Sequence, residues 1–213
     1  MPERYPGYDV LAKRDSPSWN EPTRRVIAER LAIADEPHFF TTAEWRTLTA
    51  ICARIVPQPP TRTPVPIAAM VDRKLTRDAR DGYRQASLPP LREAWRRGLA
   101  ALDAAARERH ETEFHVLPTS KQDALLKAMQ QGELTGPEWG GMPADTFFNE
   151  RLAHDILAAY YSHPTAWNEI GFGGPASPRG YVRMKANRRD PWEGVEATPG
   201  REAEARRKNE RVG

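Results

Sequence analysis

The chain has 213 residues, of which 39% are hydrophobic and 29% are charged, and its 32 basic residues nearly balance its 29 acidic ones. That length allows one domain with a real core and leaves little room for two large ones. The net charge of +3, without a long basic stripe carrying interleaved aromatic residues, gives no indication of nucleic-acid binding.

A single cysteine, Cys52, excludes an internal disulfide and any cysteine cluster for zinc or iron–sulfur. It lies in an apolar helical pattern, where a buried and inert thiol is expected. The first residues lack the apolar core of a signal peptide, and Arg24-Arg25 precedes a charged, amphipathic stretch. No apolar run approaches the roughly 20 residues that cross a bilayer. We therefore expect a cytoplasmic protein with no membrane span, or a periplasmic one if a partner chain carries the export signal.

Residues 1–38 are predicted to form an extended, proline-rich N-terminal arm with one short helix. Asn20 is placed to cap that helix and Pro22 suits its first turn. The main body, residues 39–183, begins at FFTTAEW, where Thr41 and Glu44 have the spacing of a capping box. Apolar residues then recur at helical period until a cluster of prolines at 57–60 ends the helix.

Four further helices are predicted for the body. Their starts are marked by Pro66, Pro90, Thr119 and about Ala144. Thr119 and Gln122 again have capping-box spacing, Gly132 is placed to end that helix, and the last helix extends to about Ser162. No segment alternates long enough to predict a strand. The fold class is therefore all-α: a single irregular bundle of about five main helices.

Residues 184–213 form a charged tail with few aliphatic side chains. Such a segment buries too little apolar surface to offset its ordering entropy, so we expect it to be extended or disordered. Trp192 is the one residue of the tail that is suited to anchor it on a partner.

The segment Tyr160 to Tyr181, YYSHPTAWNEIGFGGPASPRGY, combines many aromatic residues with glycine and proline but carries no set of acid, base and nucleophile. Glycine and proline at this density impose an irregular backbone path. Its aromatic residues either complete the core or contact a partner, and both alternatives stay open. The candidate interface residues are Tyr160, Tyr161, His163, Trp167, Phe172, Tyr181 and Trp192.

Motifs for chemistry are largely absent from the sequence, which lacks the glycine-rich nucleotide loops, the serine-hydrolase elbow and the haem-attachment motif. His110 and His115 are one residue too far apart for a zinc-binding helix. Glu150 and His154 can share a helix face, where an ion pair is expected rather than a ligand pair. His163, before Pro164, is expected to sit protonated at a helix C-terminus.

Three stretches resemble a known family. They are FFTTAEWRTLTAICARIVP, the run from Phe114 through LPTSKQDALLKAMQQGE, and FFNERLAHDILAAYYSHPTAWNEIGFGGPASPRGY, together spanning about residues 39–183. They are similar to the small (gamma) subunit of gluconate 2-dehydrogenase and related sugar dehydrogenases. The third stretch, with its helix, aromatic pair, His-Pro and Ile-Gly, is the most specific.

The resemblance implies a non-catalytic subunit with no catalytic, cofactor-binding or metal-binding residues of its own. Its partner would be a large flavoprotein of the glucose–methanol–choline (GMC) type, which carries FAD and oxidises a sugar, glycoside or gluconate. A cytochrome c is an electron acceptor that the resemblance admits. The small subunit would bind the large one and support its folding. Two alternatives stay open: a stand-alone helical enzyme that uses His154 or His163 with a carboxylate, and a protein that binds nucleic acid through its tail.

Overall fold

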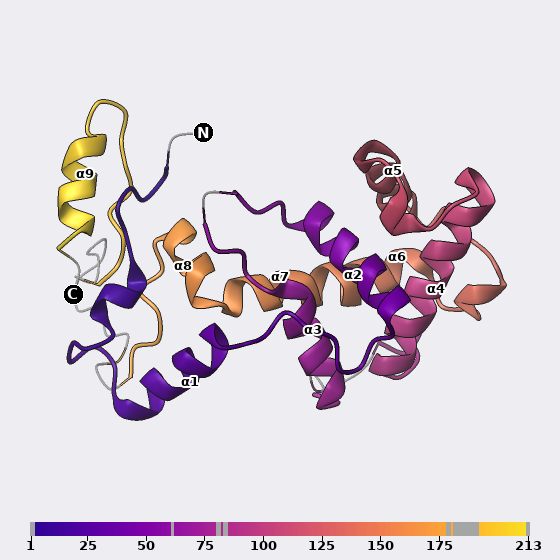
Figure 1. The fold of residues 1–213 in the computed structure, drawn as a ribbon, viewed down its shortest axis with the longest axis horizontal. Helices are drawn as coiled ribbons and strands as arrows, with labels where there is room; N and C mark the ends of the chain where they lie inside the picture. Colours follow the sequence, from indigo (N-terminus) through magenta and orange to yellow (C-terminus); the bar gives the residue numbers. More distant parts are fainter. Residues whose placement is uncertain are drawn as a thin grey trace. The chain divides into compact units, whose positions relative to one another are not determined.

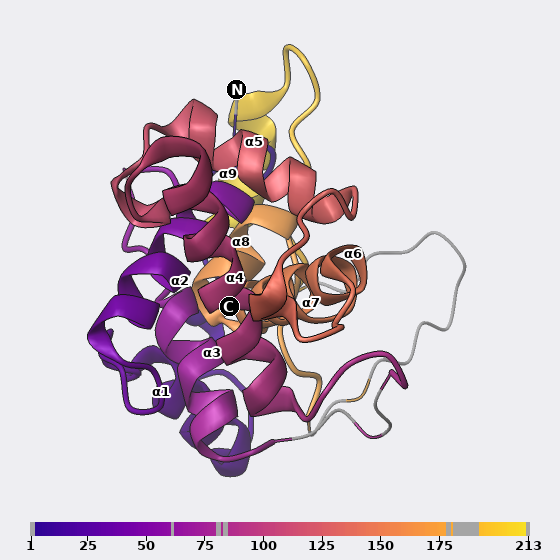
Figure 2. The same ribbon diagram turned by 90° about the vertical axis from the view of Figure 1, so that its right-hand side faces the viewer.

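The computed structural model describes residues 3–60, 62–79, 82, 85–177, 180 and 192–211. The chain divides into two compact units: unit 1 comprises Met1–Ile33 and Tyr161–Gly213, and unit 2 comprises Ala34–Tyr160. The structure is 58% helical, and the described residues contain no strand, which confirms the all-α prediction (Figures 1 and 2). The predicted domain boundaries after residues 38 and 183 stay a prediction.

Unit 2 holds the helices that the sequence predicts for the body. They are α2 (Thr42–Ile55), α3 (Ile67–Thr76), α4 (Leu91–His110), α5 (Thr119–Gln130), α6 (Ala144–Phe147) and most of α7 (His154–Ser162), with the 3-10 turns η2 (Phe114–Val116) and η3 (Pro137–Trp139). A π-helical segment, η4 (Phe148–Ala153), joins α6 to α7. The predicted helix from about Ala144 to Ser162 is thus present, with a π-helical turn inside it.

The capping predictions have different outcomes in α2 and α5. At α2 the Thr41 hydroxyl accepts from the Glu44 N–H at 3.3 Å and the Glu44 carboxylate accepts from the Thr41 N–H at 2.8 Å, so the capping box is confirmed. The same prediction for α5 is wrong, because Pro118 occupies the N-cap position. Gln122 is therefore the fourth residue of the helix rather than the third after a Thr119 cap, and it is buried and donates to the Phe114 carbonyl at 3.1 Å.

The segment that leads into α2 is fixed by one buried carboxylate. The side chain of Asp72, on α3, accepts hydrogen bonds from the backbone N–H groups of His38, Phe39 and Phe40 at 2.9–3.1 Å. These donors satisfy a charge that would otherwise be costly to bury. The contact explains why α2 starts directly after FFT.

The core of unit 2 depends on a close approach between α4 and α6. Gly98 faces the ring of Phe147, and a Cβ atom at residue 98 would overlap that ring. Phe147 also makes edge-to-face contacts with Trp95 and Trp139, at centroid distances of 5.7 and 6.2 Å. The glycine is therefore required by packing, although glycine is unfavourable inside a helix.

Unit 1 is assembled from both ends of the chain. It contains η1 (Val10–Lys13), α1 (Glu21–Leu31), α8 (Pro164–Ile170) and α9 (Glu202–Asn209). Its buried core consists of Tyr8, Val10, Trp19, Ile27 and Trp167, with Tyr5, Leu11 and Trp192 packed against it. The N-terminal arm therefore contributes core residues, and its predicted helix is α1, capped by Asn20 as expected.

The described part of the tail departs from the expected extended or disordered state, because residues 202–209 form α9. Acidic residues occupy the first turn of α9 and basic residues the last, which favours the helix through its dipole. The buried side chain of Asn209 donates to the carbonyl oxygens of Pro6 and Val195 at 2.9 and 3.0 Å and accepts from the Val195 N–H at 2.6 Å. These tertiary contacts order a segment whose composition alone predicts disorder.

Gly98→Ala should destabilise unit 2 by about 1–3 kcal/mol through overpacking, even though alanine improves helix propensity by about 1 kcal/mol. The free energy of unfolding, measured by denaturant titration, checks this. Phe147→Leu removes the ring atoms that the new methyl would meet, so the double variant should lose less stability than the sum of the single variants. Strictly additive losses would show that the two residues do not constrain each other.

Candidate functional site

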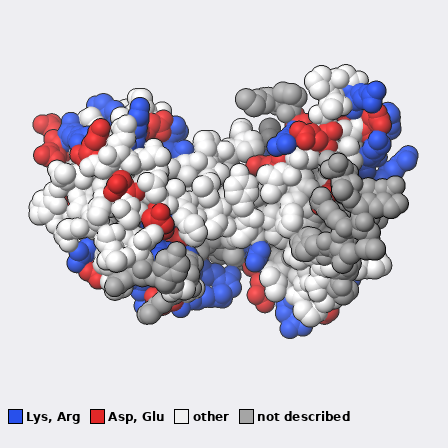
Figure 3. Space-filling view, turned by 180° about the vertical axis from the view of Figure 1, so that it is seen from behind, with Lys and Arg blue, Asp and Glu red and all other residues white. Residues whose placement is uncertain are grey.

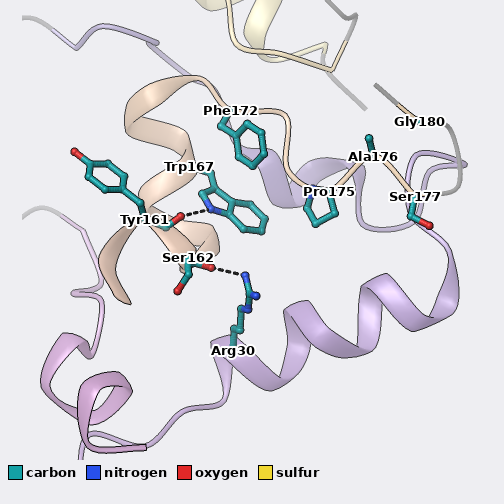
Figure 4. A pocket seen from close by; sticks show the side chains of 9 residues that line it. All are labelled: Arg30, Tyr161, Ser162, Trp167, Phe172, Pro175, Ala176, Ser177 and Gly180. Atoms are coloured by element: carbon teal, nitrogen blue, oxygen red, sulfur yellow. Dashed lines mark hydrogen bonds between the residues drawn. The ribbon is translucent and has the colours of Figure 1, made fainter. Parts of the chain in front are cut away.

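Unit 1 contains a hollow of about 680 Å³ beside α8 (Figure 4). We call it the aromatic hollow. Its lining residues are Arg30, Tyr161, Ser162, Trp167, Phe172, Pro175, Ala176, Ser177 and Gly180. They come from α1, from the end of α7, from α8 and from the irregular segment that follows α8 (Figure 4). Its volume lies within the range of about 300–1,000 Å³ that is typical of ligand pockets.

Trp167 forms a fixed wall of the aromatic hollow. Its side chain is only 3% exposed, and its indole Nε1–H donates to the Tyr161 carbonyl at 2.8 Å. The Phe172 ring meets it edge-on, with centroids 5.5 Å apart, and is 36% exposed. Tyr161 is 47% exposed. The buried indole thus packs against the partly exposed Phe172 ring and holds the backbone of Tyr161, whose exposed ring points away from the indole (Figure 4).

Two glycines allow the backbone path beneath this wall. Gly171 ends α8 at a φ of 64°, in the left-handed region that favours glycine. Gly174 has a φ of 69°, and a Cβ there would lie 3.0 Å from the Trp19 ring and 3.2 Å from the Trp167 ring. The glycines of the sequence segment are therefore needed both for backbone conformation and for close packing.

The N-terminal arm and the tail hold this path in place. The Tyr8 hydroxyl lies 3.2 Å from the Phe172 carbonyl and 2.6 Å from the Trp192 carbonyl. The indole N–H of Trp19 donates to the Pro175 carbonyl at 3.0 Å. The hollow is thus preformed by hydrogen bonds that join residues more than 150 positions apart in the sequence.

Among the lining residues that the structure describes, Arg30 is the one with a charged side chain. Its Nη1 donates to the Ser162 carbonyl at 2.6 Å, which orients the guanidinium toward the hollow (Figure 4). A guanidinium has five N–H donors, so most of them remain for another acceptor. Arg30 lies on α1, three residues after the buried Ile27, and its place in a site was not predicted from the sequence.

The predicted interface residues have several fates. Tyr161 and Phe172 are exposed and Trp167 is buried behind them, all three at the hollow. Tyr160 is buried and belongs to unit 2, and Trp192 packs partly buried against the core of unit 1. Tyr181 lies outside the described residues. Whether these residues contact a partner stays a prediction.

His163 differs from the expectation of a protonated imidazole at a helix C-terminus. Pro164 starts a new helix, α8, so His163 is its N-cap, and its Nδ1 accepts from the Thr165 N–H at 3.3 Å. Burial is the largest effect on this imidazole and lowers its pKa. A hydrogen bond with the Arg30 backbone raises the pKa, and the positive charge of Arg30 lowers it, so the net pKa is below the usual value. A helix N-terminus favours the neutral acceptor over a cation, which explains the reversal.

Acid should destabilise the protein through His163. Since the folded state holds this proton more weakly than the unfolded chain, the stabilisation is complete above pH about 6.5 and is lost as pH falls through the lowered folded pKa. His163→Asn keeps a capping acceptor but does not titrate there. Thermal unfolding at pH about 7.5 and about 5 should show the wild type losing about 1 kcal/mol more than this variant. Equal losses in the two proteins would contradict the assignment.

A second polar cluster lies inside unit 2. The side chain of Asp155 is fully buried and accepts from Trp95 Nε1 at 2.9 Å and from Lys74 Nζ at 2.8 Å. His154 Nδ1 lies 3.3 Å from the same carboxylate. The structure thus pairs His154 with its neighbour Asp155 rather than presenting it with Glu150, and it encloses the carboxylate among donors, as expected for an internal ion pair.

Asp155→Asn should destabilise the protein by about 3–5 kcal/mol, because Lys74 and the Trp95 N–H lose a buried charged partner. Asp123→Asn is the matched control, since Asp123 pairs with Arg54 at 2.7 Å on the surface. The control should change stability far less, because solvent screens exposed pairs. Denaturant unfolding of both variants measures the difference, and similar losses would remove the case for an internal ion pair.

Other candidate features give no site. Among the described residues no group of three histidines, cysteines or carboxylates is placed to hold a metal ion. His110 ends α4 and His115 lies in η2, so one helix face does not carry both. Burial raises the pKa of the Cys52 thiol.

No helix in the described part of the chain is long and apolar enough to cross a membrane. In Figure 3 acidic and basic side chains are interspersed on the visible surface of the described residues.

Exposed aromatic side chains beside a concave surface are common where proteins contact other macromolecules. The sequence matches the family described as gluconate 2-dehydrogenase subunit 3 over residues 42–174, which is more than half of the chain. The chain therefore belongs to the gluconate 2-dehydrogenase subunit 3 family, and the resemblance seen in the sequence is confirmed. The family is a subunit of a multi-subunit dehydrogenase, which implies a partner chain. No curated protein and no solved structure gave a match.

Proposed function

We propose that this chain is the non-catalytic small subunit of a sugar, glycoside or gluconate dehydrogenase, and that it binds and stabilises a GMC-type catalytic subunit that contains FAD. The membership of the subunit 3 family carries the proposal. The aromatic hollow supports it, because its exposed groups suit contact with a protein surface and include no pair of acid and base.

The cofactor and the chemistry belong to the partner in this proposal. The large subunit would hold FAD, which would supply the redox chemistry for oxidation of a substrate CH–OH group, and an acceptor such as a cytochrome c would take the electrons. The small subunit contributes binding free energy that favours the folded state of the large subunit, as any ligand of a native state does. Location follows the partner: the complex is cytoplasmic unless the large subunit carries an export signal.

The aromatic hollow is suited to this role because its geometry is set before binding. The buried Trp167 packs against the Phe172 ring and holds the Tyr161 backbone, and hydrogen bonds from Tyr8 and Trp19 hold the backbone of the segment after α8. A preformed surface loses little conformational entropy on association, so more of the contact energy appears as affinity. Aromatic side chains commonly provide the largest single contributions at interfaces.

Co-expression of the tagged chain with the flavoprotein gene from its own host tests the proposal. The tagged chain should retain a large yellow protein whose flavin spectrum is that of FAD. The double variant Tyr161→Ala/Phe172→Ala should lower the yield of complex at least about tenfold, as loss of two aromatic anchors predicts. The FAD content of each complex that does form should not change.

Two controls separate binding from folding. Leu157→Ala changes an exposed apolar residue of α7 that does not line the hollow, and it should leave the yield unchanged. Trp167→Ala removes a buried side chain and should lower the thermal unfolding midpoint, whereas the exposed double variant should not. Sugar oxidation by the purified chain without any flavoprotein, or the absence of a flavoprotein from the wild-type preparation, would overturn the proposal.

A further inference from the structure

We infer that the aromatic hollow receives an acidic segment of the catalytic subunit, in which a carboxylate lies next to an aromatic or aliphatic side chain. The inference rests on the proposed function and specifies the chemistry of its partner. It follows from the combination of one guanidinium with side chains that are otherwise uncharged, among the lining residues within the described part of the chain.

The uncharged part of the hollow selects an apolar side chain. Phe172 and Trp167 form an edge-to-face corner at 5.5 Å, and Pro175 and Ala176 line the opposite side (Figure 4). An aromatic or aliphatic group that enters this corner removes apolar surface from water on both chains. A purely polar segment would gain none of that free energy.

The charge of Arg30 selects a carboxylate. A partner that covers the hollow also desolvates the guanidinium, and a buried cation without an opposite charge is costly. The described lining residues include no acidic side chain to offset this charge, so an opposite charge from the partner would compensate it. A guanidinium held by one hydrogen bond to Ser162 can still bind a carboxylate through two parallel N–H groups.

Several of these selecting residues lie outside the part of the chain that matches the family. The match ends at residue 174, whereas Arg30, Pro175, Ala176 and Ser177 lie beyond its limits. Trp167 and Phe172 lie within it. The aromatic residues Trp167 and Phe172 therefore belong to the region shared with the family. Arg30 and the residues from Pro175 onward lie outside that region. This division fits a site that distinguishes one catalytic subunit from another.

The charge of the occupant can be tested without touching Arg30, whose hydrogen bond also supports the fold. Ser177 is exposed at the hollow. Ser177→Lys should tighten and Ser177→Glu should weaken the purified complex, with dissociation constants that differ by about tenfold at low salt and converge at high salt. Both variants lose the same contact with Asn20, so their difference reports charge. Thr198→Lys and Thr198→Glu, at an exposed site of unit 1 that does not line the hollow, should differ little.

The segment itself can be identified by placing the photo-reactive residue benzoylphenylalanine at position 172 and irradiating the complex. Mass spectrometry should find a flavoprotein peptide with an Asp or Glu close to an aromatic or aliphatic residue. Capture of a basic or uncharged peptide, of a second copy of this chain, or of nothing would overturn the inference, as would tighter binding by Ser177→Glu. A flavoprotein that still co-purifies in those cases leaves the proposed function standing, and its absence from the wild-type preparation removes the proposed function.

Discussion

The Tyr8 hydroxyl is the contact on which the arrangement of unit 1 depends. It lies within hydrogen-bonding distance of the carbonyls of Phe172 and Trp192, and so connects the N-terminal arm, the segment after α8 and the tail. Nearby, the Gly194 N–H donates to the Gly171 carbonyl at 3.0 Å and the Ala197 N–H to the Arg4 carbonyl at 2.8 Å. An irregular backbone must satisfy its polar groups in this way when no helix or sheet does so. The N-terminal arm and the tail therefore hold the segment after α8, which carries the exposed Phe172, in its position.

This constraint explains how an apolar surface stays available in a stable unit. Burial of Trp167 and Trp19 gives unit 1 its own core, so Tyr161 and Phe172 need not turn inward to complete one. Gly174 fits between those two indoles and holds the following prolyl-alanyl segment close to them. The exposure of the hollow is thus a consequence of how tightly the layer beneath it is packed. Without this packing, we expect the same aromatic side chains to fold inward and bury themselves.

Local signals in the sequence predicted α1 and the main helices of unit 2, whereas α8, α9 and the site depend on contacts between distant residues. The sequence contains these signals directly, because each is local. The Thr41–Glu44 capping box and the Asn20 cap join residues three positions apart, and a proline marks a helix start by its own backbone geometry. Trp167 could equally have faced a partner or the core, because its hydrogen bond and its packing come from residues that fold onto it from elsewhere. The role of Arg30 was hidden for the same reason. His163 was misassigned because the sequence did not reveal that a second helix begins at Pro164.

The charges of Asp155 and Arg30 differ in whether other side chains of the protein compensate them. Asp155 is enclosed by Trp95 and Lys74, and a charge whose partners are all internal is already compensated before any other molecule arrives. Arg30 has one internal acceptor, the Ser162 carbonyl, which is uncharged. Its full charge therefore remains to be compensated by solvent in the free chain and by a partner once solvent is displaced. Enclosed charge stabilises the fold of unit 2, whereas the charge of Arg30 lies beside an apolar wall and is the property on which the inferred selectivity of the aromatic hollow depends.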